Sequence, residues 1–241
     1  MKKIVYLCER TTPLIMKTCA KITKINGVQL YIFICKNNNS SFEFYFKMVM
    51  CFFLCGFTGI NLLLRTKNNN RLKIIKGHLE DSQSLDWLNK IQPDIGIHNM
   101  NIIYRNPVIN SFKMGIINSH IGILPTFRGR SVMEWAVLQQ KKTGITAFFL
   151  DEGIDTGKNI ICCNYYSLSN FKNIKSAKKY LITLRYKTIY KAINLIMSEQ
   201  YQPIINDVTK GKRYYEISSS FLKIAENNLI IDFLKQKKKT I

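Results

Sequence analysis

The chain has 241 residues, of which 46% are apolar, so it can bury a sizeable core and is not a globally disordered protein. Lys and Arg number 36 against 15 Asp and Glu, a formal net charge of +21. This balance favours anionic partners, but the charge is spread thinly along a Lys-, Asn- and Ile-rich chain. We therefore expect compositional bias and a small anionic substrate rather than a dedicated nucleic-acid surface.

Strands and helices alternate through the first 140 residues or so. Short β-branched runs between polar turns predict strands, and amphipathic stretches predict helices. In chain order we expect a strand at 3–8, a helix at 14–24, a strand at 28–35, a helix at 42–65, a strand at 71–76, a helix capped by Ser82 through 91, strands at 94–98 and 114–118, a helix at 131–140, strands at 144–150 and 158–163, and a helix at 175–199. The pattern predicts an α/β fold with a mainly parallel sheet and helices on both faces.

The remaining segment, 201–241, is expected to be short and polar, with one apolar stretch at 217–234. We divide the chain into a catalytic domain at 1–170 and a second part at 171–241. The second part holds the long helix and a short C-terminal α+β extension. It is a candidate for nucleotide binding or for dimerisation.

The lack of a signal-peptide pattern and the spacing of the cysteines predict a cytoplasmic protein. No apolar segment near the start is long enough for a signal peptide. Residues 48–64 carry no charge, but glycines interrupt them, so we expect a buried helix and leave membrane contact open. The cysteines show no C-x-x-C and are odd in number, which predicts unpaired thiols and no metal site. They are Cys8, Cys19, Cys35, Cys51, Cys55, Cys162 and Cys163.

Two nucleotide-binding motifs are absent from the sequence. The first turn, 8–13, has no glycine, which argues against the G-x-G-x-x-G loop of NAD or FAD enzymes. No G-x-x-x-x-G-K-[ST] occurs either, so the sequence excludes P-loop nucleotide hydrolysis.

The segment 118–129 carries the strongest chemical signal. Asn118 and His120 alternate by two after a strand, so both side chains point the same way. A second turn after a strand, 151–157, can bring Asp155 to the same sheet edge. An amide, an imidazole and a carboxylate suit attack of an amine on a formyl carbonyl. Asn118 and a protonated His120 would stabilise the oxyanion, and Asp155 would help remove the amine proton.

The bland interpretation is a structural turn, since a lone N-x-H is common by chance. The ordered conjunction is much harder to obtain by chance. It comprises Asn118, His120, Leu124-Pro125, Arg128-Gly129, Trp135-Ala136, Gly144-Ile145-Thr146 and Asp155-Thr156-Gly157.

This conjunction resembles the central stretch of the folate-dependent formyltransferases. The resemblance implies a Rossmann-like domain, N10-formyltetrahydrofolate as co-substrate, no metal, and catalytic roles for Asn118, His120 and Asp155. It also implies a pterin pocket bordered by three loops, whose residues are Asn101, Ile103, Gly122, Ile123, Leu124, Pro125, Leu150, Asp151 and Glu152. Ile121 and Thr126 depart from the family's pattern and affect the folate loop.

The resemblance is closest to the nucleotide-sugar N-formyltransferases. The segment 210–215 resembles their short C-terminal strand, and its basic and aromatic residues suit a pyrophosphate and a nucleobase. The expected substrate-binding residues are Arg10, Lys212, Arg213, Tyr214 and Tyr215. A basic surface turn is the alternative for this segment. The expected partners are a reduced folate and a dTDP- or UDP-sugar, with dTDP-4-amino-4,6-dideoxyglucose as the leading acceptor for O-antigen or lipopolysaccharide synthesis.

Other acceptors and other classes of protein stay open. Methionyl-tRNA formyltransferases share the motif but carry a C-terminal barrel of about 100 residues, for which barely 40 residues after the long helix are too few. Glycinamide ribonucleotide formyltransferases have a Gly-rich loop after the first strand that is not found here. A basic RNA- or membrane-binding protein on a retired scaffold is the alternative from another class. We expect a homodimer, with neither nucleic acid nor membrane as a partner.

Overall fold

The computed structural model describes residues 1–36, 72–76 and 78–239. The predicted helix at 42–65 and its apolar core at 48–64 lie outside the described residues, as do Cys51 and Cys55. The chain forms two compact units, one made of 1–118 with 193–200 and the other of 119–192 with 201–241. A strand, β5, and a helix, α7, each run from one unit into the other.

The first unit is built on a parallel sheet, in which β1 pairs with β2 on one side and β4 on the other. β3 extends the sheet beyond β2, and β5 extends it beyond β4. The strands are β1 (Lys2–Cys8), β2 (Val28–Lys36), β3 (Leu72–Lys76), β4 (Ile95–Asn99) and β5 (Gly115–His120). The central strand is buried from Ile4 to Cys8, as expected for a parallel strand covered on both faces. The predicted α/β fold with its parallel sheet is confirmed.

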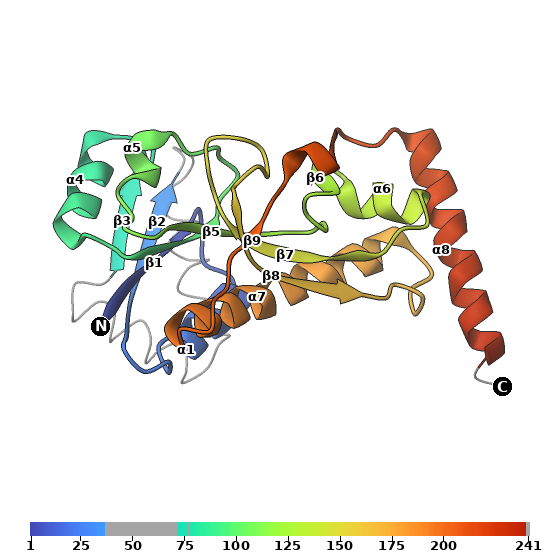
Figure 1. The fold of residues 1–241 in the computed structure, drawn as a ribbon, viewed down its shortest axis with the longest axis horizontal. Coiled ribbons are helices and arrows are strands. Elements are labelled where there is room, and N and C mark those ends of the chain that lie inside the picture. Colours follow the sequence, from blue (N-terminus) through green and yellow to red (C-terminus); the bar gives the residue numbers. More distant parts are fainter. Residues whose placement is uncertain (37–71, 77, 240–241) are drawn as a thin grey trace. The chain divides into compact units, whose positions relative to one another are not determined.

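Among the described residues, the helices that flank this sheet include α1 (Pro13–Ile22), α4 (Ser82–Ile91) and α5 (Asn106–Ile109). Figure 1 shows α1 on one side of the sheet and α4 with α5 on the other. Thr12 caps α1 by accepting a hydrogen bond from the Ile15 N–H. Ser82, the predicted cap of α4, is instead its first helical residue, because Asp81 holds the N-cap position. The Trp87 ring anchors α4 to β2, 5.3 Å from the Phe33 ring.

The main strands of the second unit pair antiparallel, unlike the parallel strands of the first unit. β7 (Thr143–Phe149) pairs with β8 (Asn159–Tyr166), and β8 with the short β9 (Ile204–Ile205). A separate two-stranded ribbon joins β6 (Phe127–Gly129) in parallel to β10 (Lys212–Tyr214). The ribbon ties the C-terminal segment to the loop that follows β5. A 3₁₀ turn, Val208–Lys210, precedes β10.

The helices of the second unit share one apolar core. α6 (Val132–Leu138), α7 (Ile174–Met197) and α8 (Ser219–Lys239) contribute Val137, Leu181 and Leu229 to it. The apolar stretch expected at 217–234 lies largely in α8, where Ala225 and Leu229 are buried. In Figure 1, α8 runs alongside α6.

The structure also shows the state of the described cysteines, and it can be searched for metal-binding groups and membrane-spanning helices. None of the described cysteines forms a disulfide; they are Cys8, Cys19, Cys35, Cys162 and Cys163. Within the described ranges, no group of three or more His, Cys, Asp or Glu side chains could hold a metal ion. In the same part of the chain, no helix has the length and apolar character needed to span a bilayer.

Candidate active site

The imidazole of His120 and the carboxylate of Asp155 lie together in the second unit. His120 is the last residue of β5, and Asp155 is in the loop between β7 and β8. Nδ1 of His120 is 3.4 Å from Oδ2 of Asp155, and both side chains are about 90% buried. A buried imidazole beside a buried carboxylate is the arrangement of a general acid–base pair.

The far side of the His120 ring is held by backbone. Its Nε2 lies 2.8 Å from the carbonyl oxygen of Phe127, the first residue of β6. A carbonyl only accepts hydrogen bonds, so Nε2 carries a proton and donates it, leaving Nδ1 toward Asp155. The hydrogen bond between Nε2 and Phe127 requires a glycine at position 122. A Cβ there would lie 2.5 Å from Nε2 and 2.8 Å from the Phe127 carbonyl oxygen.

The Asp155 loop is held by hydrogen bonds from two other segments of the chain. Asp155 itself has a left-handed backbone with φ of +55°, a strained conformation that persists only where its surroundings hold it. The Gly129 N–H donates to Asp155 Oδ2 at 2.9 Å. From the C-terminal segment, the buried Asn206 amide donates to the carbonyl oxygens of Asp155 and Gly157 at 3.2 and 3.0 Å. The polar sequence around Asn206 had given no sign of this role.

The Gly-Ile-Thr motif at the middle of β7 holds the loop that follows His120. The Thr146 hydroxyl donates to the Gly122 oxygen at 2.7 Å and accepts from the Leu124 N–H at 3.2 Å. At Gly144, a Cβ would collide with the Ile123 side chain and the Asn164 oxygen. These residues therefore shape the loop beside His120.

Asn118 sits on the same strand, two residues before His120. Strand alternation gives both side chains the same direction from the β5 backbone. Its Oδ1 is buried and has no hydrogen-bond partner among the described residues. A buried, unsatisfied amide oxygen is uncommon and fits a group that a ligand completes.

The residues expected around the pterin fall into both units. In the second unit, Leu124 is buried and packs with Phe148, Ile160 and the half-buried Leu150. The Asp151 carboxylate accepts from the Gly153 N–H and the Thr156 hydroxyl at 3.0 and 2.7 Å, so it shapes the Asp155 loop. Glu152 is exposed, and the Leu124–Pro125 peptide bond is cis.

The first unit holds the other expected ligand-binding residues. Asn101 and Ile103 are exposed in the segment after β4, where the Asn101 N–H donates to Glu9 Oε1 at 2.8 Å. Arg10 is exposed after β1.

The segment expected to bind the nucleotide lines a pocket of about 430 Å³ in the second unit. Arg213, Tyr214 and Tyr215 border it, together with Gly129, Arg130, Ile154 and Glu216. Gly129 holds Asp155 and Ile154 precedes it, so the pocket adjoins the His120–Asp155 pair. Lys212 is exposed at the start of β10.

The two tyrosines in this pocket differ in their surroundings. The Tyr214 ring is stacked on Phe127 at 5.2 Å and packed against Trp135 at 5.5 Å, so it works as a core side chain. Tyr215 is 66% exposed, with the Arg213 guanidinium 5.2 Å from its ring centre. Of the two rings, Tyr215 is the one with an open face, whereas Tyr214 borders the same pocket as part of an aromatic cluster.

Arg185 of α7 is a residue that the sequence did not single out. Its Nε donates to the Ser119 carbonyl oxygen at 2.7 Å, and the Ser119 hydroxyl lies 3.3 Å from the same nitrogen. Ser119 is fully buried and directly precedes His120. Arg185 therefore fixes the peptide unit that ends in the catalytic candidate.

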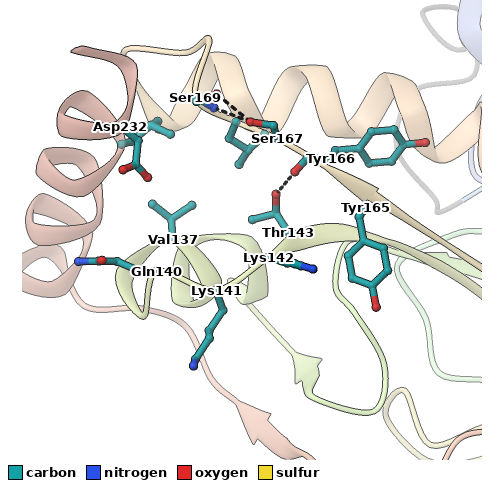
Figure 2. A pocket seen from close by; sticks show the side chains of 12 residues that line it. Val137, Gln140, Lys141, Lys142, Thr143, Tyr165, Tyr166, Ser167, Ser169 and Asp232 are labelled. Carbon is teal, nitrogen blue, oxygen red and sulfur yellow. Dashed lines mark hydrogen bonds between the residues drawn. The ribbon is translucent and has the colours of Figure 1, made fainter. Parts of the chain in front are cut away.

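A second pocket, of about 390 Å³, lies at the other end of β7. Figure 2 shows Thr143 and Tyr166 on one side of it and Asp232 of α8 on another. The Thr143 hydroxyl donates to the backbone carbonyl oxygen of Tyr166 at 2.6 Å. Because Asp155 follows the opposite end of β7, this pocket is separate from the His120 site.

The sequence of residues 70–167 matches the family described as formyl transferase. The chain is 34% identical over 118 residues to a methionyl-tRNA formyltransferase of Azobacteroides pseudotrichonymphae, covering 48% of this chain and 36% of that relative. The match thus spans about a third of the relative's length.

Solved structures share the fold over nearly the whole chain. A 4-N formyltransferase from Francisella tularensis gives a TM-score of 0.60 at 18% identity, covering 95% of this chain and 87% of its own. An N-formyltransferase from Helicobacter canadensis, in complex with folinic acid and dTDP-3-aminofucose, gives 0.57 at 17% identity, covering 96% and 81%. Residues 70–167 of this chain therefore resemble the formyl transferase family in sequence, and the solved formyltransferases share its fold.

Proposed function

We propose that this chain transfers the formyl group of N10-formyltetrahydrofolate to the amine of a nucleotide-linked amino-deoxy sugar. The observation that carries the proposal is the buried contact between His120 and Asp155, 3.4 Å apart at the end of β5. It lies inside the segment that matches the formyl transferase family.

The chemistry is a direct transfer with no covalent enzyme intermediate. The amine nitrogen attacks the formyl carbon, and negative charge builds on the carbonyl oxygen. The Asn118 amide nitrogen and the Nδ1–H of protonated His120 donate hydrogen bonds to that oxygen, because the Nε2–H of His120 is held by the Phe127 carbonyl oxygen. Each donor is worth about 10²–10³ in rate by analogy with other oxyanion donors. Asp155 accepts the amine proton, directly or through water. The bond from the formyl carbon to N10 then breaks, N10 takes a proton, and a formamide and tetrahydrofolate leave.

The Asn118 amide suits this role in a second way. Its Oδ1 is buried and lacks a partner among the described residues, so it can accept an N–H of the incoming amine. The amide thereby orients the nucleophile while its nitrogen faces the developing charge. This would satisfy an atom that is otherwise left without a hydrogen bond.

The reduced folate would lie along the loops that frame the His120–Asp155 pair. Gly122 to Pro125 follow His120, and Leu150 to Glu152 precede Asp155. Leu124 and Leu150 share one apolar cluster, which offers a wall for the pterin. We keep Asn101 and Ile103 of the first unit as further folate-binding residues.

The pocket beside Asp155 supports a phosphorylated acceptor. Arg130 and Arg213 supply guanidinium groups suited to a pyrophosphate. The exposed ring of Tyr215 supplies a face on which a nucleobase can stack. Lys212 of the same segment is assigned to this anionic ligand, and Arg10 of the first unit stays a proposed substrate-binding residue. The full-length likeness to sugar N-formyltransferases, one of them solved with dTDP-3-aminofucose, favours a dTDP- or UDP-sugar for cell-surface glycan synthesis.

A panel of acceptors tests the proposal. Purified protein is incubated with N10-formyltetrahydrofolate and one acceptor at a time, and each product is weighed by mass spectrometry. The acceptors are dTDP-4-amino-4,6-dideoxyglucose, its UDP counterpart, glycinamide ribonucleotide and methionyl-tRNA. We expect a folate-dependent gain of one formyl group on a nucleotide sugar. A gain confined to another acceptor would overturn the sugar assignment but keep formyl transfer.

Methionyl-tRNA is the second candidate acceptor. The relative from Azobacteroides pseudotrichonymphae is a methionyl-tRNA formyltransferase, and a net charge of +21 suits a polyanion. If this candidate holds, formylation of methionyl-tRNA should fall steeply as salt is raised, because Lys and Arg would release counterions from the phosphates. Formylation of a nucleotide sugar should depend on salt far less.

A further inference from the structure

The pocket of about 390 Å³ at the start of β7 has no role in the proposed reaction. Its floor is apolar, formed by the buried side chains of Val137, Leu168 and Leu229. These residues come from α6, from the segment after β8 and from α8, so three parts of the second unit border it. A pocket of this volume with an apolar floor is of the size that takes a small organic ligand.

The turn between α6 and β7 presents two lysines to this pocket. The Lys141 N–H donates to the Ala136 oxygen at 2.8 Å and the Gln140 N–H to the Val137 oxygen at 3.0 Å, the two hydrogen bonds of a Schellman motif. Gln140 holds the left-handed position of this motif, with φ of +53°, where glycine is usual because a Cβ is strained there. The turn fixes the backbone at Lys141 and Lys142, and all three side chains line the pocket.

The charged groups of the pocket lie at opposite ends. Lys141 and Lys142 are exposed, and no carboxylate among the described residues forms an ion pair with either ammonium group. The Lys142 ammonium lies 5.6 Å from the ring centre of Tyr165. Figure 2 shows Asp232 of α8 at the other end, across from Lys142 and Tyr165. The Asp232 carboxylate is 4.0 Å from the Lys235 ammonium, an exposed contact that contributes little, so it can accept from a ligand.

Hydrogen bonds hold the side of the pocket that follows β8. The Ser167 hydroxyl oxygen accepts from the Ser169 N–H at 3.3 Å and lies 2.8 Å from the Ser169 hydroxyl. The Ser169 hydroxyl also bonds to the Gln236 side chain of α8. At the start of β7, the Thr143 hydroxyl is bonded to the backbone of Tyr166. The pocket is therefore preformed, which lowers the entropy lost when a ligand binds.

We propose that this pocket binds a guanine nucleotide, with the phosphate at Lys141 and Lys142 and the base toward Asp232. Two neighbouring ammonium groups match the charge of a phosphate monoester, which is close to −2 at neutral pH. A carboxylate only accepts hydrogen bonds, so Asp232 pairs with the two adjacent donors of the guanine edge, N1–H and N2–H₂. The purine ring between these ends covers the apolar floor. The inference does not depend on the reaction that the chain catalyses.

The Asp232 carboxylate also sets this ligand apart from the dTDP- or UDP-sugar proposed as acceptor. Thymine and uracil present a single N–H between two carbonyl oxygens, and those oxygens would repel the carboxylate. Adenine presents one amino donor beside a ring nitrogen that only accepts. The expected order of affinity is therefore GMP first, AMP second and UMP last.

Isothermal titration calorimetry of the full chain tests the proposal, with GMP, AMP, UMP and inorganic phosphate as separate probes. GMP should bind at least about tenfold more tightly than UMP or inorganic phosphate, because hydrogen bonds to a charged group are strong. Lys141→Met/Lys142→Met should weaken GMP binding at least about tenfold. Lys179→Met/Lys187→Met is the matched control, because it removes two exposed lysines of α7 that do not line the pocket. Asp232→Asn should abolish the preference for GMP over UMP.

Photo-cross-linking locates the bound nucleotide. 8-Azidoguanosine 5′-monophosphate should label peptides that contain residues 140–143 or 165–169, as read by mass spectrometry. Labelling confined to residues 213–216 would assign the nucleotide to the acceptor pocket and overturn the site. Equal affinity for GMP and inorganic phosphate would reduce the site to a phosphate contact and overturn the nucleotide. Equal losses in the two double-lysine variants, both folded by circular dichroism, or no binding of GMP to the wild type, would also overturn the proposal.

Discussion

Oδ2 of Asp155 is shared between two hydrogen-bonding groups: it lies 2.9 Å from the Gly129 N–H and 3.4 Å from Nδ1 of His120. The backbone donor holds the carboxylate in one orientation, and the carboxylate in turn faces the imidazole. The Phe127 oxygen holds the other ring nitrogen at 2.8 Å. His120 and Asp155 therefore form one positioned unit rather than two independent groups.

Removing either member of the unit should cost most of the activity. His120→Ala and Asp155→Asn should each lower kcat about 10²–10³-fold, since each removes a group that acts in the transition state. The double variant should be little slower than either single variant, because residues that act as a unit are not additive. Initial rates of formyl transfer measure all three. Losses that multiply in the double variant would show that the two residues act separately.

Gly129 should be intolerant of a side chain. Its φ is +100°, and a Cβ would collide with the backbone carbonyl oxygen of Tyr214 across the β6–β10 ribbon. We expect Gly129→Ala to lower the free energy of unfolding by about 1–3 kcal/mol, from backbone strain together with the collision. Urea denaturation measures this change.

Gly27→Ala separates the two causes of that loss. Gly27 also has a positive φ, +76°, but its Cβ would make only ordinary contact with Met197 at 3.5 Å. Gly27→Ala should therefore lower the free energy of unfolding by about 1–2 kcal/mol, through the backbone conformation alone. Equal losses at the two glycines would mean that the collision at Gly129 relaxes without cost.

Asn206 should control the Asp155 loop from outside the family motif. Asn206→Ala removes two buried hydrogen bonds to the loop backbone. We expect a loss of about 1–3 kcal/mol in stability and a fall in kcat, because Asp155 would no longer be held in its left-handed conformation. Asn164→Ala is the control, since that amide bonds to Thr188 and Lys191 on α7. It should affect stability but not kcat.

Arg185 should act on the reaction through His120. Arg185→Met removes the donor to the Ser119 oxygen, so β5 should hold His120 less firmly and kcat should fall about tenfold or more, with the KM for folate nearly unchanged. Steady-state kinetics measures the two separately. Arg185→Lys should restore part of the rate, because an ammonium can donate to the same oxygen.

Lys178→Met provides the comparison for Arg185 on the same helix. It breaks the ion pair between Lys178 Nζ and Glu134 Oε1, 2.7 Å apart, in which the Glu134 carboxylate is buried. We expect lower stability with unchanged kcat. An equal fall of kcat in both variants would mean that Arg185 contributes only to folding.

Two buried thiols should resist alkylation. Burial raises the pKa of Cys162 to about 11, and burial together with the nearby Asp81 and Glu9 raises the pKa of Cys35 to about 11. At pH 8, only about one molecule in 10³ would carry the thiolate at either position. Iodoacetamide treatment of the native protein, followed by peptide mass spectrometry, should leave both unmodified, whereas the unfolded protein should react fully. Rapid modification of either thiol in the native state would contradict this expectation.

Local patterns were enough to predict the sheet and the centre of the site. Short β-branched runs such as Lys2–Cys8 mark buried strands whatever surrounds them, and the structure has β1 there. The Asn-x-His and Asp-x-Gly turns each end a strand, which is why their meeting could be expected from topology alone. Gly144 and Thr146 stand in the same motif because they shape the loop beside His120.

The rest depends on contacts between distant segments, which a single sequence does not display. In the sequence, Asn206 is an ordinary polar loop residue, and only the structure shows its hydrogen bonds to the Asp155 loop. Arg185 is likewise an ordinary basic residue of an amphipathic helix, and only the structure shows its bond to Ser119. The stacking of Tyr214 on Phe127 likewise follows from the pairing of β10 with β6, two segments distant in the sequence. The sequence indicated an apolar stretch at 217–234 but no particular helix there, because the exposed isoleucines obscure the periodicity of the buried face.

The most direct test of the account follows a labelled formyl group. N10-formyltetrahydrofolate carrying ¹³C in the formyl carbon is mixed with the protein and dTDP-4-amino-4,6-dideoxyglucose, and NMR follows the formyl resonance. The account predicts that the label moves to a sugar formamide in step with release of tetrahydrofolate, and that His120→Ala slows this at least about 100-fold. Transfer at the wild-type rate by folded His120→Ala, or no transfer by the wild type to any amine of the acceptor panel, would contradict it.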